Sequence, residues 1–156
     1  MTKILILFYS RTGVTKKIAE ALQSATGADR EEIRDPKDRR GALGYLMSGR
    51  EATLSKTGKI LPLQKKLADY DLIIIGTPIW AYNVSKAIRT LVTEQKNNIK
   101  KYAFFCTEGG EGAGRAQKKL EELLGQPAIA SLELLTKEAL TGNYQDKLTA
   151  FVNILK

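Results

Sequence analysis

Residues 3–22 read KILILFYSRTGVTKKIAEAL, and this stretch decides the fold. Lys3 to Tyr9 is an almost unbroken apolar run, which is typical of a strand buried on both faces of a parallel sheet. From Val14 onward the apolar residues recur with helical spacing, and Gly27 supplies a stop signal for that helix. The stretch therefore predicts a strand, a tight turn and a helix in immediate succession.

The same unit recurs along the rest of the chain. Further strands are expected at 28–34, 71–76, 102–106 and 129–135. Further helices are expected at 61–67, 84–94, 113–124 and 141–155. The stretch from 37 to 58 is rich in glycine and charge and shows only partial helical periodicity, at 43–54. Five strands that alternate with helices predict an α/β fold with a parallel sheet covered on both sides.

The composition describes one folded domain and excludes several kinds of chemistry. With 156 residues, 43% hydrophobic and 27% charged, the chain fits a single domain over 1–156. It contains no histidine, which excludes triads with a histidine base and removes the commonest metal ligand, so no metal site is predicted. Its one cysteine, Cys106, excludes an internal disulfide and is interpreted as a small core residue. A cytoplasmic location is therefore expected.

The chain is basic, with a formal charge of +8, and most of the excess lies at 37–66. That segment carries eight Lys or Arg residues against two acidic ones, which gives 8 − 2 = +6. Tyr45 is the only aromatic among them, which argues against nucleic acid and favours a solvated basic face or small anionic partners. The apolar run at 4–9 is too short for a signal peptide or a membrane span. We expect neither secretion nor membrane insertion.

Three loops follow the central strands, and ligands of open parallel sheets bind beyond the carboxyl ends of such strands. The first loop, 10–15, offers three hydroxyls and a glycine just before a helix, where backbone N–H groups attract anions. It predicts a phosphate site, although Ser10 or Thr12 could equally cap the helix while Gly13 makes the turn. Neither a Walker sequence nor Gly-x-Gly-x-x-Gly is present, which disfavours ATP and dinucleotides.

The second loop, 77–83, contains Trp80, the only tryptophan, and Tyr82. Either ring can stack on a flat ligand or can pack in a loop core. The third loop, 107–112, has three glycines, which allow close approach of the backbone to a ligand but also serve a simple turn. An aromatic loop beside a phosphate loop predicts a nucleotide-like ligand.

Residues 6–22 closely resemble the amino-terminal signature of flavodoxins, and 76–80 resembles their second flavin loop. This resemblance implies a flavodoxin-like three-layer α/β/α fold whose five parallel strands have the order 2-1-3-4-5. It also implies FMN at the switch between the first and third strands, an arrangement for which flavodoxin is a standard example. The third loop matches the family only loosely.

The resemblance also implies a role for each loop residue. The FMN phosphate would be bound by the hydroxyls of Ser10, Thr12 and Thr15 and the N–H groups of Arg11, Gly13 and Val14. The ribityl chain and the isoalloxazine would be lined by Thr77, Pro78, Ile79 and Trp80, with Tyr82 and Asn83 from the same loop. The pyrimidine side of the ring would be bordered by Thr107, Glu108, Gly109 and Gly112.

Three functions remain open at this stage. The first is an FMN electron carrier between redox proteins, which requires no catalytic side chain. The second is an FMN-dependent oxidoreductase that passes hydride from NAD(P)H to a quinone-type or anionic acceptor, favoured by the positive charge and the absence of an aromatic in the third loop. The third is a binding module without flavin. Glu108 and Glu111 are interpreted as solvated loop carboxylates, so no catalytic residue is predicted.

Overall fold

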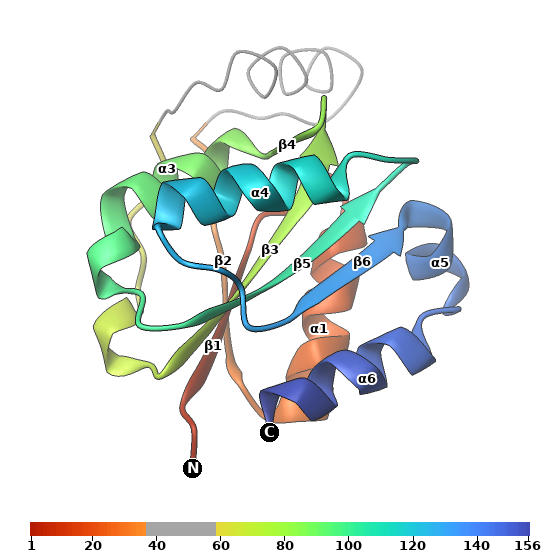
Figure 1. Ribbon diagram of the computed structural model, residues 1–156, viewed down its shortest axis with the longest axis horizontal. Helices are drawn as coiled ribbons and strands as arrows, with labels where there is room; N and C mark the ends of the chain where they lie inside the picture. Colours follow the sequence, from red (N-terminus) through yellow and green to blue (C-terminus); the bar gives the residue numbers. More distant parts are fainter. Residues whose placement is uncertain (37–58) are drawn as a thin grey trace.

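The computed structural model describes residues 1–36 and 59–156 and consists of a parallel sheet between two layers of helices (Figure 1). The parallel strands are β1 (Ile4–Phe8), β2 (Asp29–Glu32), β3 (Leu72–Trp80), β5 (Tyr102–Glu108) and β6 (Ser131–Leu135). The helices are α1 (Val14–Thr26), α3 (Lys86–Gln95), α4 (Ala113–Leu124), α5 (Thr136–Thr141) and α6 (Gln145–Leu155). Two short 3₁₀ turns, η1 (Leu67–Asp69) and η2 (Lys96–Asn98), complete these elements together with the short strand β4 (Asn83–Val84).

The strand order is β2-β1-β3-β5-β6, with β4 paired only to β3. Neighbouring strands along this path are parallel, with Leu5 opposite both Asp29 and Ile73. Without the antiparallel β4, this is the predicted order 2-1-3-4-5, so the predicted fold class is confirmed. The order reverses direction between β1 and β3, which leaves a gap above their carboxyl ends.

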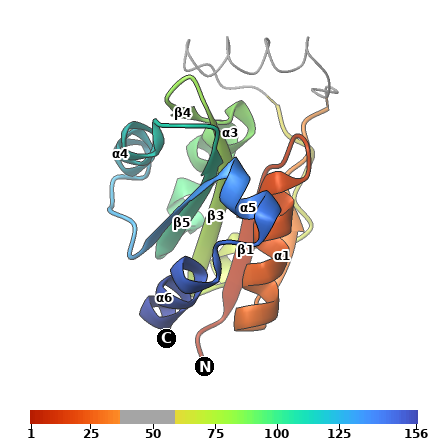
Figure 2. The same ribbon diagram turned by 90° about the vertical axis from the view of Figure 1, so that its right-hand side faces the viewer.

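Alternate residues of the strands pack into two separate hydrophobic cores. Leu5, Leu7 and Ile75 face the core beneath α3 and α4, whereas Ile6 and Phe8 face the core beneath α1 and α6. Figure 2 shows α1 and α4 on opposite sides of the sheet. Burial on both faces explains why the central strands read as unbroken apolar runs in the sequence.

A close approach between β3 and β5 depends on Gly76. A Cβ atom built on Gly76 would lie 2.0 Å from the ring of Phe105, which is fully buried. The Phe105 ring therefore occupies the volume that a side chain on β3 would need. This packing fixes the two strands that lead to the second and third loops.

The predicted helix at 61–67 is wrong, because only the 3₁₀ turn η1 forms there and it begins at Leu67. The N–H of Leu61 donates to the carbonyl of Arg34 at 2.9 Å. The carboxylate of Glu31 accepts the N–H groups of Gln64 and Lys65 at 2.6 and 3.0 Å. In a helix over 61–67 the Lys65 N–H would donate to the carbonyl of Leu61, but Glu31 of β2 binds that N–H instead.

Other boundaries also differ from the prediction. β3 continues to Trp80, and α3 begins at Lys86 because the Ser85 hydroxyl accepts the N–H of Ile88 at 3.4 Å. The helix predicted at 141–155 is replaced by α5 and α6, since Gly142 ends α5 with a φ of 79°. The expected periodicity at 43–54 and most of the basic segment 37–66 lie outside the described residues.

Within 1–36 and 59–156, no helix combines the length and the apolar content that crossing a membrane requires. The same residues contain no group of three His, Cys, Asp or Glu side chains placed to bind a metal ion.

Candidate functional site

A cavity of about 200 Å³ lies beyond the carboxyl ends of β1, β3 and β5. It is lined by Ser10, Arg11, Thr12, Val14, Thr15, Pro78, Ile79, Trp80, Thr107, Glu108, Gly109 and Thr136. The structure thus brings together eleven of the predicted site residues, from all three loops, and adds Thr136. The other five, Gly13, Thr77, Tyr82, Asn83 and Gly112, do not line this cavity.

The first loop curls around the Ser10 hydroxyl. This oxygen accepts the N–H groups of Gly13 at 3.1 Å and Lys16 at 3.2 Å. Gly13 has a φ of 95°, which turns the chain into α1 in a conformation that glycine adopts without strain. In this structure Ser10 binds the Gly13 N–H, and the role of that N–H as a phosphate ligand stays a prediction. The hydroxyl hydrogen of Ser10 is still available to donate.

A buried pair of hydroxyls connects α1 to β5. Thr15 and Thr107 are 2% and 3% exposed, and their Oγ1 atoms lie 2.8 Å apart. One hydrogen is used between them and the other can be directed to a ligand. Thr12, in contrast, is exposed on the rim of the same cavity. The site therefore presents several hydroxyl donors next to the positive end of the α1 dipole.

The aromatic wall of the cavity is formed by Trp80, which is 8% exposed. Tyr9 meets its ring edge to face at 83°, with the centroids 5.9 Å apart. The guanidinium of Arg11 lies over the Trp80 ring at 5.9 Å from the centroid. Contacts with the Arg11 guanidinium and the Tyr9 ring therefore restrict the indole.

The rest of the second loop forms a hairpin instead of facing the cavity. Trp80 pairs with Asn83 across a two-residue turn whose residues, Ala81 and Tyr82, have φ values of 49° and 59°. Thr77 is buried, and its hydroxyl accepts the N–H of Ser85 at 3.0 Å. Asn83 is also buried, with its side-chain oxygen bound to the N–H of Val84 at 2.9 Å. Both side chains thus stabilise the hairpin.

Tyr82 is at the tip of this hairpin and is 44% exposed. The guanidinium of Arg115 lies 5.3 Å from its ring centroid. A Cβ on Gly112, which has a φ of 122°, would come within 3.0 Å of the Tyr82 ring. Gly112 therefore makes room for Tyr82 and does not line the cavity.

The third loop contributes a buried carboxyl. Glu108 is 9% exposed, and its Oε2 accepts the N–H of Ala113 at 3.1 Å. Burial raises the pKa of Glu108, opposed by that hydrogen bond and reinforced by the carboxylates of Glu133 and Glu111. The interpretation of Glu108 as a solvated carboxylate is wrong, because β5 extends to this residue and buries it. Glu111 is exposed, as predicted.

Thr136 and Cys106 both lie at β5, one at its carboxyl end and the other within it. Thr136 donates its hydroxyl to the carbonyl of Glu108 at 3.2 Å. It was missed by the sequence analysis, although its position just after the last strand was the available signal. Cys106 is fully buried, and burial raises the pKa of its thiol, which agrees with the predicted core role.

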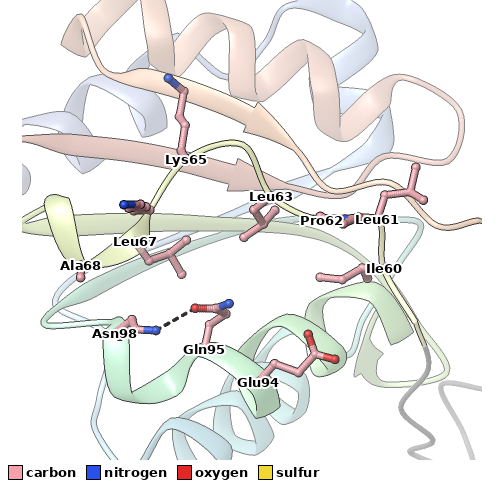
Figure 3. Close-up of a pocket in the computed structure, with 11 residues that line it drawn as sticks. Ile60, Leu61, Pro62, Leu63, Lys65, Leu67, Ala68, Glu94, Gln95 and Asn98 are labelled. Carbon is pink, nitrogen blue, oxygen red and sulfur yellow. Dashed lines mark hydrogen bonds between the residues drawn. The ribbon is translucent and has the colours of Figure 1, made fainter.

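A second cavity of about 570 Å³ lies between residues 60–68 and the end of α3 (Figure 3). Its lining includes the apolar residues Ile60, Leu61, Pro62, Leu63 and Leu67. Of the polar side chains around it, Asn98 donates to Gln95 at 2.9 Å, and the Lys65 ammonium lies 3.8 Å from Asp29.

A family model described as Flavodoxin matches residues 3–154. The chain belongs to the flavodoxin family. The family membership predicted from 6–22 and 76–80 is therefore confirmed, and the cavity occupies the β1/β3 switch point at which members of such doubly wound folds bind ligands.

Solved flavodoxin-like structures align with most of this chain. A flavoprotein from Lactobacillus acidophilus NCFM in complex with FMN shares 25% identity and a TM-score of 0.75, over 96% of this chain and 99% of that chain. The two-electron reduced flavodoxin of Megasphaera elsdenii shares 18% identity and a TM-score of 0.53, over 85% of each chain. An apo NADH:FMN oxidoreductase shares 16% identity and a TM-score of 0.54, over 96% and 88%. The last two show a common fold alone.

Proposed function

We propose that this flavodoxin-family chain binds one FMN noncovalently in the cavity at the β1/β3 switch point and transfers electrons between redox partner proteins. The observation that carries the proposal is the convergence of hydroxyl donors and an indole ring on one cavity. The FMN complex of the Lactobacillus acidophilus flavoprotein, similar over nearly the whole chain, supports it.

The hydroxyl side of the cavity fits a phosphate. Ser10 and Thr12 can each donate a hydroxyl hydrogen, and one of the two hydrogens of the Thr15–Thr107 pair is available. Hydrogen bonds to a charged acceptor are worth about 1.5–3 kcal/mol each. The first turn of α1 adds N–H groups and a favourable dipole, and Arg11 adds a positive charge. This side would anchor the phosphate end of FMN.

The aromatic side fits a flat ring. Pro78, Ile79 and Trp80 form a continuous wall, and the indole is held by Tyr9 and Arg11. The cavity volume of about 200 Å³ is below the roughly 300–1,000 Å³ usual for pockets that enclose a drug-sized ligand. Part of a bound flavin would therefore be open to the surroundings, which suits transfer of electrons to a docked protein.

FMN, when bound, supplies the redox chemistry, because it can take up and release one or two electrons. The chain's own residues then have to bind, orient and partly shield it. Trp80 would restrict the flavin ring on one side, while the hydroxyls of the first loop would hold the phosphate and so fix the position of the whole FMN. This division requires no nucleophile and no general base, in agreement with the absence of histidine.

A second candidate is an FMN-dependent NAD(P)H oxidoreductase with a quinone-type or other small acceptor. The observation that favours it is the exposed pair of Tyr82 and Arg115 beside the cavity. A cation next to an exposed aromatic ring can hold a phosphate and a flat base of a dinucleotide. In this case the open side of the flavin would receive the hydride.

The FMN proposal is tested by purification of the chain, absorption spectroscopy, and chromatography of the flavin released by acid. We expect one FMN per chain; FAD, or no flavin after addition of excess FMN, would contradict the proposal and, in the second case, favour a binding module without flavin. Steady-state NAD(P)H oxidation separates the two redox candidates. A carrier shows little turnover without a partner reductase, whereas an oxidoreductase turns over with NAD(P)H and a quinone.

A further inference from the structure

Glu108 is a buried carboxyl in the wall of the proposed flavin cavity. It follows Thr107 on β5, and successive side chains of a strand point to opposite faces. Thr107 accordingly reaches Thr15 of α1, at 2.8 Å, while the Glu108 carboxyl reaches the Ala113 N–H at the start of α4, at 3.1 Å. The carboxyl is thus fixed in position by the fold.

The charges around Glu108 make its ionised form costly. Glu133 on β6 and Glu111 in the third loop are both acidic and oppose its ionisation. From α4 the Ala113 N–H favours the carboxylate, and from α5 Thr136 binds only the backbone carbonyl of Glu108. Across the cavity, in the first loop, Arg11 is the cation among the described lining residues. Burial and two like charges outweigh the single N–H bond, so the pKa of Glu108 is raised.

Reduction of a bound flavin would add to this imbalance. Two electrons and one proton convert the neutral oxidised ring into a reduced ring that carries one extra negative charge. Glu108 is only 9% exposed, and interactions of a partly buried charge are screened less than those between exposed charges. The added charge therefore favours the neutral form of the carboxyl that lines the same cavity.

We propose that Glu108 takes up a proton from solvent when the flavin is reduced and releases it when the flavin is reoxidised. The proposal rests on the proposed FMN site. In balance, two electrons from a redox partner and one proton enter the flavin, one proton neutralises the Glu108 carboxylate, and no net charge is added to the cavity. Oxidation returns both protons and both electrons. Glu108 acts as a proton-holding residue that tunes the potential, not as the hydride or electron donor.

The test compares the FMN-loaded wild type with Glu108→Gln and with the matched control Glu111→Gln. The measured quantity is the midpoint potential of the two-electron couple as a function of pH. Between the pKa values of Glu108 in the oxidised and reduced proteins, the wild type binds two protons per two electrons. Outside that window Glu108 does not change protonation state, and its contribution to the slope disappears.

Within that window we expect Glu108→Gln to take up one proton fewer per two electrons than the wild type. The slope of its midpoint potential against pH should therefore be up to twofold shallower. Glu111→Gln should keep the uptake of two protons per two electrons, with the window moved to lower pH, because the Glu111 carboxylate helps to raise the pKa of Glu108. Protonation of the reduced flavin itself also steepens the slope, and the infrared signal of the carboxyl group separates that protonation from protonation of Glu108. A Glu108→Gln profile identical to that of the wild type would overturn the proposal.

An infrared difference spectrum of reduced minus oxidised wild type provides a measurement that does not depend on folding of the variant. A protonated-carboxyl C=O band should appear on reduction, and its absence would overturn the proposal. Failure of the wild type to bind FMN at all would instead refute the proposed function, and this inference with it.

Discussion

The cavity at the β1/β3 switch point and the larger cavity beside residues 60–68 differ in the polar groups that line them. The larger, about 570 Å³, is lined mainly by apolar residues of 60–67, its Asn98 and Gln95 side chains bind each other, and its Lys65 ammonium lies 3.8 Å from Asp29. The smaller, about 200 Å³, gathers hydroxyls, an indole, a guanidinium and a carboxyl from separate loops. Convergence of donors, and not volume, therefore identifies the candidate site. Substitutions at the smaller cavity should therefore weaken FMN binding, whereas substitutions around the larger cavity should change only the stability of the fold.

The largest effect is expected for Thr12→Ala. Loss of a hydroxyl donor to the phosphate should weaken FMN binding by about 1.5–3 kcal/mol, on the order of 10- to 150-fold in Kd. Because Thr12 is exposed, folding should be almost unchanged. Titration of apoprotein with FMN and with riboflavin measures the effect, and riboflavin affinity should change much less.

The matched control for Thr12→Ala is Gln95→Ala, which removes a polar group from the larger cavity. It should leave the FMN affinity at the wild-type value. Equal weakening of FMN by both variants, or equal loss of FMN and riboflavin in Thr12→Ala, would remove the distinction between the two cavities.

A smaller effect is expected at the aromatic wall. Stacking is worth about 0.5–1.5 kcal/mol beyond area burial, so Trp80→Phe should weaken FMN binding by no more than that amount. Trp80 is the only tryptophan, and its fluorescence in the wild type should be strongly quenched as FMN binds. Tyr82→Ala is the control, because Tyr82 does not line the cavity. An unquenched indole at saturating FMN would show that the ring only packs the loop.

Glu31→Gln is expected to affect the wall of the larger cavity alone. Its carboxylate binds the N–H groups of Gln64 and Lys65, and the substitution keeps only one oxygen acceptor. We expect a loss of about 0.5–1 kcal/mol in the free energy of unfolding, measured by urea denaturation. The FMN affinity should stay unchanged. A parallel loss of FMN binding would show that the segment 60–68 and the proposed site are coupled.

No change in FMN affinity at neutral pH is expected for Tyr70→Phe, because Tyr70 lies outside the lining of both cavities. The hydroxyl of Tyr70 donates to Asp29 at 2.6 Å, and this bond raises the pKa of Tyr70 to about 12. A raised folded-state pKa stabilises the protein fully below the unfolded value of about 10, and the contribution is lost as pH rises towards 12.

Tyr70→Phe should therefore flatten the alkaline fall in stability, as measured by thermal unfolding at increasing pH. The wild type and the variant should bind FMN equally at neutral pH. An unchanged alkaline profile in the variant would show that the Tyr70–Asp29 bond does not contribute to folding.

The sequence predicted the central part of the fold because burial on both faces leaves a signature within each strand. The apolar runs at 4–8, 72–76 and 102–106 required no knowledge of distant residues. The failed helix at 61–67 shows the opposite case: the Glu31 carboxylate that holds Gln64 is 33 residues away in sequence. Such a contact competes with local helical periodicity but leaves no mark in it.

In the candidate site, too, residues marked by local sequence features were predicted, whereas those placed by turns and strand ends were not. Ser10, Thr12 and Thr15 were predicted because the glycine turn and the helix start are local features. The hairpin at the end of β3 was not, since Ala81 and Tyr82 adopt positive φ without the Asn-Gly or Asp-Gly sequence typical of such turns. The burial of Glu108 depends on where β5 ends, and Thr107 and Glu108, two polar residues directly before glycines, are typical of a loop although β5 includes both.

The packing of Phe105 over Gly76 has a consequence for how this chain can change by mutation. A larger residue at Gly76 alone would overpack the core, at a typical cost of about 1–3 kcal/mol or more, since its Cβ would meet the ring at 2.0 Å. A small residue at Phe105 alone would leave a cavity, at about 3–5 kcal/mol. Either single step is comparable to a large part of the stability of a small domain. Substitutions at Gly76 and Phe105 are therefore expected to be tolerated only in combination, with a larger residue at 76 compensated by a smaller one at 105.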